Sequence, residues 1–123
     1  MKTTEFEGKN YKVFGIDTPY GHEDVICVPR KYQGGELAIE MISLADGIPV
    51  ESFAVLTVNL DCYTGAKTQS DTRAYVDTNN NDHWGCRDFI MKYGLGKPTG
   101  QLTLSGFCIY PLYEFNLNKF YAK

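Results

Sequence analysis

Residues 36–60 of the chain read ELAIEMISLADGIPVESFAVLTVNL and contain the two clearest strand signals of the sequence. We expect one strand over residues 37–44 and a second over residues 53–60, because apolar and β-branched residues are concentrated in both. Asp46-Gly47 lies between them, and an Asp-Gly pair favours the tight turn of a hairpin. This segment therefore predicts an antiparallel β-hairpin.

Shorter signals on both sides of this hairpin predict further strands. Runs of apolar or alternating residues place them at residues 11–16, 25–28, 74–76 and 107–115. Pro29 is expected to end the run at 25–28, because proline cannot donate a hydrogen bond to a neighbouring strand. Turn-forming or polar composition predicts loops at residues 62–72 and 96–100, and residues 117–123 are expected to fray.

One helix is predicted in the C-terminal half of the chain. Cys86, Phe89, Ile90 and Tyr93 have the i, i+3, i+4, i+7 spacing of a single helix face. We expect the helix to run for about three turns, with a cap from Asn80, Asn81 or Asp82 at its start and a stop at Gly94. The chain is therefore predicted to be a single α+β domain over residues 1–123, with a mostly antiparallel sheet of five to seven strands packed on this one helix.

Composition and charge exclude several classes of function. The 123 residues carry a formal net charge of −3, with 12 Lys and Arg against 15 Asp and Glu, and no basic block. Direct binding to nucleic acid is disfavoured, because it normally needs a basic face. No signal peptide and no apolar run of membrane-spanning length are recognisable. The four cysteines are far apart, so we expect reduced, mostly buried thiols in a cytoplasmic protein that does not contact a membrane.

The residues with chemical potential cluster between positions 77 and 88. His83-x-x-Cys86 is a close pair of potential zinc ligands, but a structural zinc site needs about four ligands. The same pair with Asp77 could form a thiolate and base, although an oxyanion hole cannot be identified. A buried cysteine beside an exposed histidine is the favoured interpretation, and no catalytic residue is assigned.

A partial calcium-loop pattern occupies the same segment. Asp77-x-Asn79-x-Asn81 matches the first half of such a loop, and Asp88 stands at its last position. The sixth position is Asp82 instead of the glycine that makes the sharp turn of these loops. We therefore favour a turn and a helix cap, and expect no metal and no cofactor.

Aromatic residues near the C-terminus suggest a binding surface. A strand with apolar residues on both faces needs two covers, so one or two of these aromatic residues are expected to be exposed. Together with the polar segment they form a candidate binding surface: Asp77, Asn79, Asn80, Asp82, His83, Trp84, Lys97, Tyr110 and Tyr113.

An ordered series of motifs gives the chain a resemblance to a known family. These motifs are AYVDTNN at residues 74–80, Trp84, GLG at 94–96, PTG at 98–100, and SGFC at 105–108. Over roughly residues 35–116 the chain resembles a family of small domains of unknown function carried on conjugative elements and phages of bacteria. The resemblance implies an accessory protein of mobile DNA, and it supplies neither an activity nor catalytic residues.

These observations lead us to expect a non-enzymatic protein that acts by binding another protein. An accessory protein of this kind can counter host defence, for example as an anti-CRISPR-like inhibitor that binds a host nuclease, and an acidic protein suits a basic partner. One alternative is a structural or scaffold protein of element transfer that self-associates as a homo-oligomer. Less favoured alternatives are a small enzyme that uses Cys86, His83 and Asp77, and a calcium-binding module.

Overall fold

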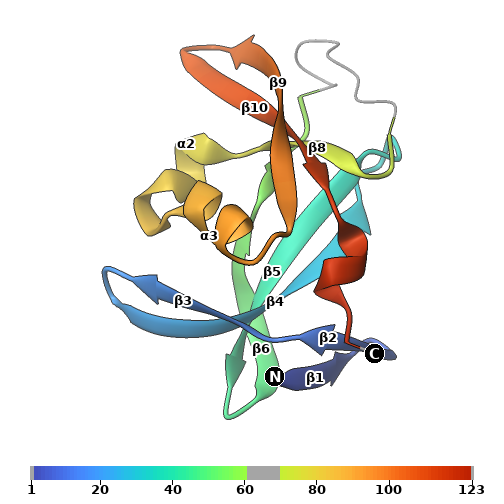
Figure 1. Ribbon diagram of the computed structural model, residues 1–123, viewed down its shortest axis with the longest axis vertical. Helices are drawn as coiled ribbons and strands as arrows, with labels where there is room; N and C mark the ends of the chain where they lie inside the picture. Colours follow the sequence, from blue (N-terminus) through green and yellow to red (C-terminus); the bar gives the residue numbers. More distant parts are fainter. Residues whose placement is uncertain (1, 61–69, 123) are drawn as a thin grey trace.

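The computed structural model describes residues 2–60 and 70–122, and in this part of the chain the strands form three antiparallel sheets (Figure 1). A hairpin near the N-terminus pairs β1 (Thr3–Phe6) with β2 (Lys9–Lys12). The second sheet has the order β3-β4-β5-β6, with the bounds Phe14–Thr18, Gly21–Lys31, Leu37–Ala45 and Ile48–Val55. The third sheet has the order β7-β8-β10-β9, with the bounds Thr57–Val58, Arg73–Val76, Cys108–Phe115 and Gly96–Ser105.

The predicted fold of one sheet on one helix is wrong, although the antiparallel pairing is confirmed. The predicted strand at 53–60 changes sheets at Leu56. Its N–H donates to Ile39 O of β5 over 2.9 Å, whereas its C=O accepts the N–H of Asp77, just after β8, over 2.9 Å. One continuous apolar run thus supplies β6 to one sheet and β7 to the other, and the sequence pattern contains no signal at the change.

The predicted helix of about three turns is also wrong, because the chain breaks it into shorter pieces. The segment forms α2 (Thr78–Asn81), the 3₁₀ turn η1 (Asp82–Trp84) and α3 (Cys86–Lys92). Gly85 separates the last two with a left-handed φ of 84°, a conformation that glycine adopts without a Cβ penalty. The predicted apolar face is confirmed, because Cys86, Phe89 and Ile90 are buried and Tyr93 packs against the core.

The central hairpin is confirmed by β5 and β6. Asp46 and Gly47 form its turn with φ values of 52° and 80°, the left-handed angles that this tight turn requires. Pro29 does not end its strand as predicted, since β4 continues to Lys31. Ile39 lies opposite Pro29, but both of its backbone groups bond on the other side of β5: its N–H donates to Thr57 Oγ1 and its C=O accepts the N–H of Leu56. Pro29 therefore does not need an N–H to pair with Ile39.

The main core lies between the second and third sheets and includes the buried face of α3. Phe14 of β3 lies 4.9 Å from the ring of Tyr93, and Phe89 lies 5.8 Å from Trp84 (ring centroids). The expected fraying after residue 117 is wrong for the described residues, because η2 (Leu117–Phe120) buries Phe120 completely in this core. The loop predicted at 96–100 is also wrong, because these residues begin β9.

The cysteines mostly follow the prediction. Cys27 and Cys86 are buried free thiols and Cys108 is partly buried. Cys62 and most of the loop predicted at 62–72 lie outside the described residues. No helix within residues 2–60 and 70–122 is long and apolar enough to span a membrane.

Candidate functional site

The polar segment after β8 begins with a helix cap. Asp77 is the N-cap of α2: its Oδ1 accepts the backbone N–H of Asn80 over 3.2 Å, and its Oδ2 accepts Asn80 Nδ2 over 2.8 Å. The predicted cap at Asn80, Asn81 or Asp82 is wrong for the helix that carries Cys86, because α3 begins after Gly85 with no side-chain cap. Asp77 of the same polar segment caps α2 instead. Asp77 and Asn80 bind each other, which leaves them fewer groups for a ligand.

Asn81 and Trp84 hold the segment against the body of the protein. Asn81 is 4% exposed; its Nδ2 donates to Val55 O over 2.8 Å and its Oδ1 accepts Trp84 Nε1 over 3.0 Å. Trp84 is 7% exposed and packs edge-on against Phe53 and Phe89. Trp84, predicted to belong to the binding surface, is therefore a core residue.

Asp82 connects η1 to α3. Its Oδ1 accepts the thiol of Cys86 over 3.4 Å, and its Oδ2 accepts Arg87 over 2.8 Å. Burial, followed by the bond to Asp82, raises the pKa of the Cys86 thiol to about 12. A thiol with this pKa is protonated at neutral pH and is a poor nucleophile. His83, the predicted partner of Cys86, is exposed, whereas the Cys86 thiol donates its hydrogen bond to Asp82.

The partial calcium pattern does not form a loop of converging oxygens. Asp77 caps α2, and Asn81 uses both ends of its amide inside the protein. Within residues 2–60 and 70–122, no group of three or more His, Cys, Asp or Glu side chains is placed to hold a metal ion.

An exposed hollow lies where α2 meets the tip of the β9–β10 hairpin. Its volume is about 380 Å³, and its lining residues are Thr78, Asn79, Asp82, Phe107, Cys108 and Ile109. Thr78 Oγ1 donates to Ile109 O over 3.5 Å and so fixes α2 beside β10. Phe107 is fully exposed (109%) and Ile109 is 54% exposed. The predicted residues Asn79 and Asp82 are thus exposed next to an apolar tip.

The remaining predicted residues do not join this surface. Tyr110 is 9% exposed and packs in a small cluster on the opposite face of β10, whereas Tyr113 is 7% exposed and stacks on Phe115 at 6.1 Å in the main core. Lys97 is exposed at the start of β9, about 26 Å along the strand from Ser105 at a rise of about 3.3 Å per residue.

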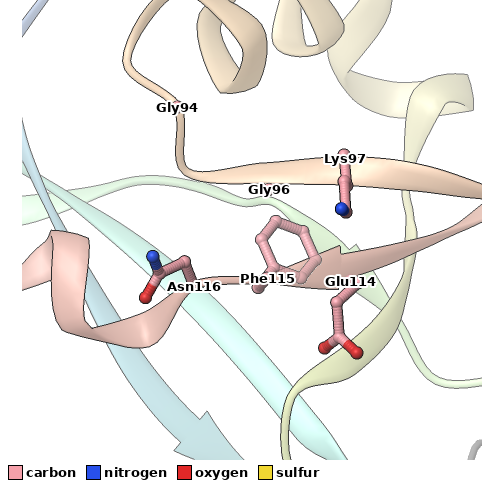
Figure 2. Close-up of a pocket in the computed structure, with 6 residues that line it drawn as sticks. All are labelled: Gly94, Gly96, Lys97, Glu114, Phe115 and Asn116. Atoms are coloured by element: carbon pink, nitrogen blue, oxygen red, sulfur yellow. The ribbon is translucent and has the colours of Figure 1, made fainter.

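Lys97 instead borders a smaller hollow of about 240 Å³ (Figure 2). Figure 2 shows Lys97 and Glu114 on neighbouring strands, with the Phe115 ring beside Gly96. Hydrogen bonds from Thr72 and Arg73 lower the pKa of Glu114, and the charge of Lys97 adds to this effect. Arg73 Nε donates to Glu114 Oε1 over 3.2 Å, whereas Glu114 Oε2 is buried and has no hydrogen-bond partner among the described residues.

Residues 28–122, from within β4 to just after η2, match the model of a protein family. The chain belongs to the DUF4313 family, a domain of unknown function. This confirms the resemblance to a small domain of unknown function. No curated protein and no solved structure matches the chain.

Sequence reasoning missed four exposed apolar side chains of this DUF4313 domain, including Phe107, which is more exposed than any other large apolar residue of the described part of the chain. They lie on the β9–β10 hairpin and comprise Leu102, Leu104, Phe107 and Ile109. The available signal was the alternation of QLTLS at residues 101–105, which is typical of a strand, followed by a Gly-Phe turn. The absence of charge from residue 98 to residue 113 was a second signal.

Proposed function

We propose that the protein acts by binding another protein, without catalysis, through the surface around Phe107. The observation that carries this proposal is the complete exposure of Phe107 beside the hollow lined by Asn79, Asp82 and Ile109. A few aromatic anchors surrounded by polar residues supply most of the binding energy of protein interfaces. Phe107 and its neighbours have this arrangement before any partner is bound.

The proposed partner is a basic protein of a bacterial host. The net charge of −3 favours steering of a basic partner toward the protein. A nuclease carries a basic surface for its nucleic acid. Taken with the resemblance to accessory proteins of mobile elements, this supports a cytoplasmic role in countering host defence by binding a defence nuclease.

The test is capture from a bacterial host lysate, followed by titration of the purified captured protein against the chain. We expect Phe107→Ser to weaken binding by about tenfold or more, because it removes the aromatic anchor. Tyr20→Ser is the matched control, since Tyr20 is 93% exposed but lies at the β3–β4 turn. Equal affinity of the wild type and Phe107→Ser would overturn the proposal.

A second candidate function is that of a structural protein of element transfer that self-associates. The outer position of β9 in its sheet favours it, because an unpaired strand edge can receive another strand.

A further inference from the structure

Strand β9 is an outer strand whose edge differs from the two outer edges of the second sheet, on β3 and β6. In the order β7-β8-β10-β9 it pairs with β10, and no strand of the described residues pairs with its other side. On β3, the Tyr93 hydroxyl binds both backbone groups of Gly15, over 3.2 and 2.9 Å. β6 carries Pro49 and Glu51, and its pairing with β5 shifts register twice. Covering groups, proline, charge and bulges are the features that keep edge strands from pairing.

β9 lacks these features from Leu102 to Ser105, although its register against β10 shifts between Pro98 and Leu102. Its proline, Pro98, stands near the start, and no residue from 98 to 113 is charged. Leu102 and Leu104 have exposed fractions of 62% and 67%. An uncharged edge with exposed apolar side chains is suited to receive a further strand.

β9 also has backbone N–H and C=O groups that point away from β10, toward its unpaired edge. In an antiparallel pair, opposite residues alternate between those that exchange hydrogen bonds and those that do not. Pro111 lies opposite Leu102 and has no N–H, so this pair is of the second kind. The N–H and C=O of Leu102 therefore point away from β10. The alternation gives Leu104, opposite Ile109, the same direction.

We propose that a second copy of the chain binds this edge, with the two β9 strands antiparallel about a twofold axis at Thr103. Leu102 of each copy then lies opposite Leu104 of the other, and each such pair exchanges its outward N–H and C=O groups. The four leucine side chains share one face of the joined sheet. This inference rests on the second candidate function, self-association, and names its contact surface.

Self-complementarity selects a second copy as the occupant. Pairing about Thr103 places leucine opposite leucine, and Gln101 opposite Ser105, so that no charge meets a like charge. Two molecules of net charge −3 repel each other at most surfaces, and this uncharged hairpin is a place where they can meet without a direct penalty.

The available area predicts a weak dimer. Leu102 and Leu104 are the apolar side chains at the paired edges, since Phe107 lies at the turn outside the pairing. Edge pairing covers the sides of the two strands and leaves the outer face of the sheet exposed, so the interface is smaller than that of a standard specific complex. We expect a micromolar dissociation constant rather than an obligate dimer.

The experiment is sedimentation of the full chain from about 1 μM to about 1 mM, in a range that brackets micromolar affinity. We expect a reversible monomer–dimer equilibrium. The double variant Leu102→Lys/Leu104→Lys should be monomeric throughout, because lysine then faces lysine. Mixing it with Leu102→Glu/Leu104→Glu should restore a heterodimer. The control Ile48→Lys/Val50→Lys changes two exposed apolar residues of β6 and should dimerise like the wild type.

Each contrary outcome has a defined meaning. A wild-type chain that is monomeric at every concentration overturns the inference, and the same result is expected if β9 receives a strand from another protein. A dimer that survives Leu102→Lys/Leu104→Lys keeps self-association but overturns the β9 edge. Capture of a partner that depends on Phe107 is measured separately, so binding of another protein can fail or succeed independently of the dimer. Circular dichroism of each variant confirms that it is folded.

Discussion

The indole N–H of Trp84 donates to Oδ1 of Asn81 over 3.0 Å, and the other end of the same amide donates to Val55 O over 2.8 Å. This pair joins η1 to the end of β6 through buried groups. It keeps α2 in place beside the hairpin tip, and so holds Asn79 and Asp82 next to Phe107.

Replacing Asn81 with alanine should lower the free energy of unfolding by about 1–3 kcal/mol, because the buried Trp84 N–H is then left without its acceptor. Urea denaturation of Asn81→Ala measures this loss. Asn79→Ala is the control, since Asn79 is an exposed neighbour and its loss should cost less than about 0.5 kcal/mol. Equal stability of the two variants would show that the Asn81 bonds contribute little.

The Trp84–Asn81 pair also shows where sequence reasoning stops. The spacing of Cys86, Phe89 and Ile90 predicted a buried helix face correctly, since this periodicity depends on local geometry alone. Nothing local distinguishes Asn81, which is buried, from Asn79 and Asn80, which are exposed. That difference depends on Val55, which is 26 residues earlier in the chain.

The residues of the candidate binding surface also fall into two groups, those that the local sequence places correctly and those that it does not. Asn79 and Asp82 were predicted as surface residues because polar side chains at a turn are normally exposed, and they are. For Tyr110 and Tyr113, composition could not separate a core ring from an exposed one. Tertiary packing decided the matter: Tyr110 packs in the small cluster with Tyr75 and Tyr113 lies in the main core, whereas Phe107 lies at the turn.

Gly96 should tolerate no side chain. A Cβ there would lie 2.8 Å from the backbone oxygen of Glu114 and 2.9 Å from the Phe115 ring, and the strands would have to separate. We expect Gly96→Ala to cost about 1–3 kcal/mol by overpacking. Thermal unfolding with Gly15→Ala as the comparison tests this, because the Cβ of Gly15 would meet the ring tip of His22 at 2.8 Å, which can move aside. A smaller loss for Gly96→Ala than for Gly15→Ala would contradict the prediction.

His22 should titrate above its ordinary pKa of 6.5. Its Nδ1 bonds to Asp17 over 2.8 Å and its Nε2 to Asp24 over 2.9 Å, and these bonds raise the pKa, with Asp17 as the larger cause. Both ring nitrogens can donate only in the imidazolium form. The stabilisation from protonated His22 is therefore complete below pH 6.5 and is lost as pH rises through the raised pKa.

The Asp24 partner has the opposite dependence. The bond from His22 lowers the pKa of Asp24 below 3.8, so its contribution is present above that pH and is lost as pH falls through the lowered value. An NMR titration of the His22 ring should show a lower pKa in Asp17→Asn than in the wild type, with a smaller decrease in Asp24→Asn. A wild-type His22 pKa at or below 6.5 would show that the two carboxylates do not hold the ring in solution.

Cys86 should be nearly inert to alkylation in the folded protein. It is fully buried, and burial together with its bond to Asp82 raises the pKa of the thiol to about 12, so at pH 8 nearly every molecule carries the unreactive thiol instead of the thiolate. Cys108 is partly exposed on β10 and should be modified before Cys86. Iodoacetamide labelling followed by peptide mass spectrometry separates the two sites, and labelling in urea provides the fully reactive reference. If Cys86 reacts as fast as Cys108 in the native protein, the Cys86 thiol is accessible in solution and is not held by burial and by Asp82.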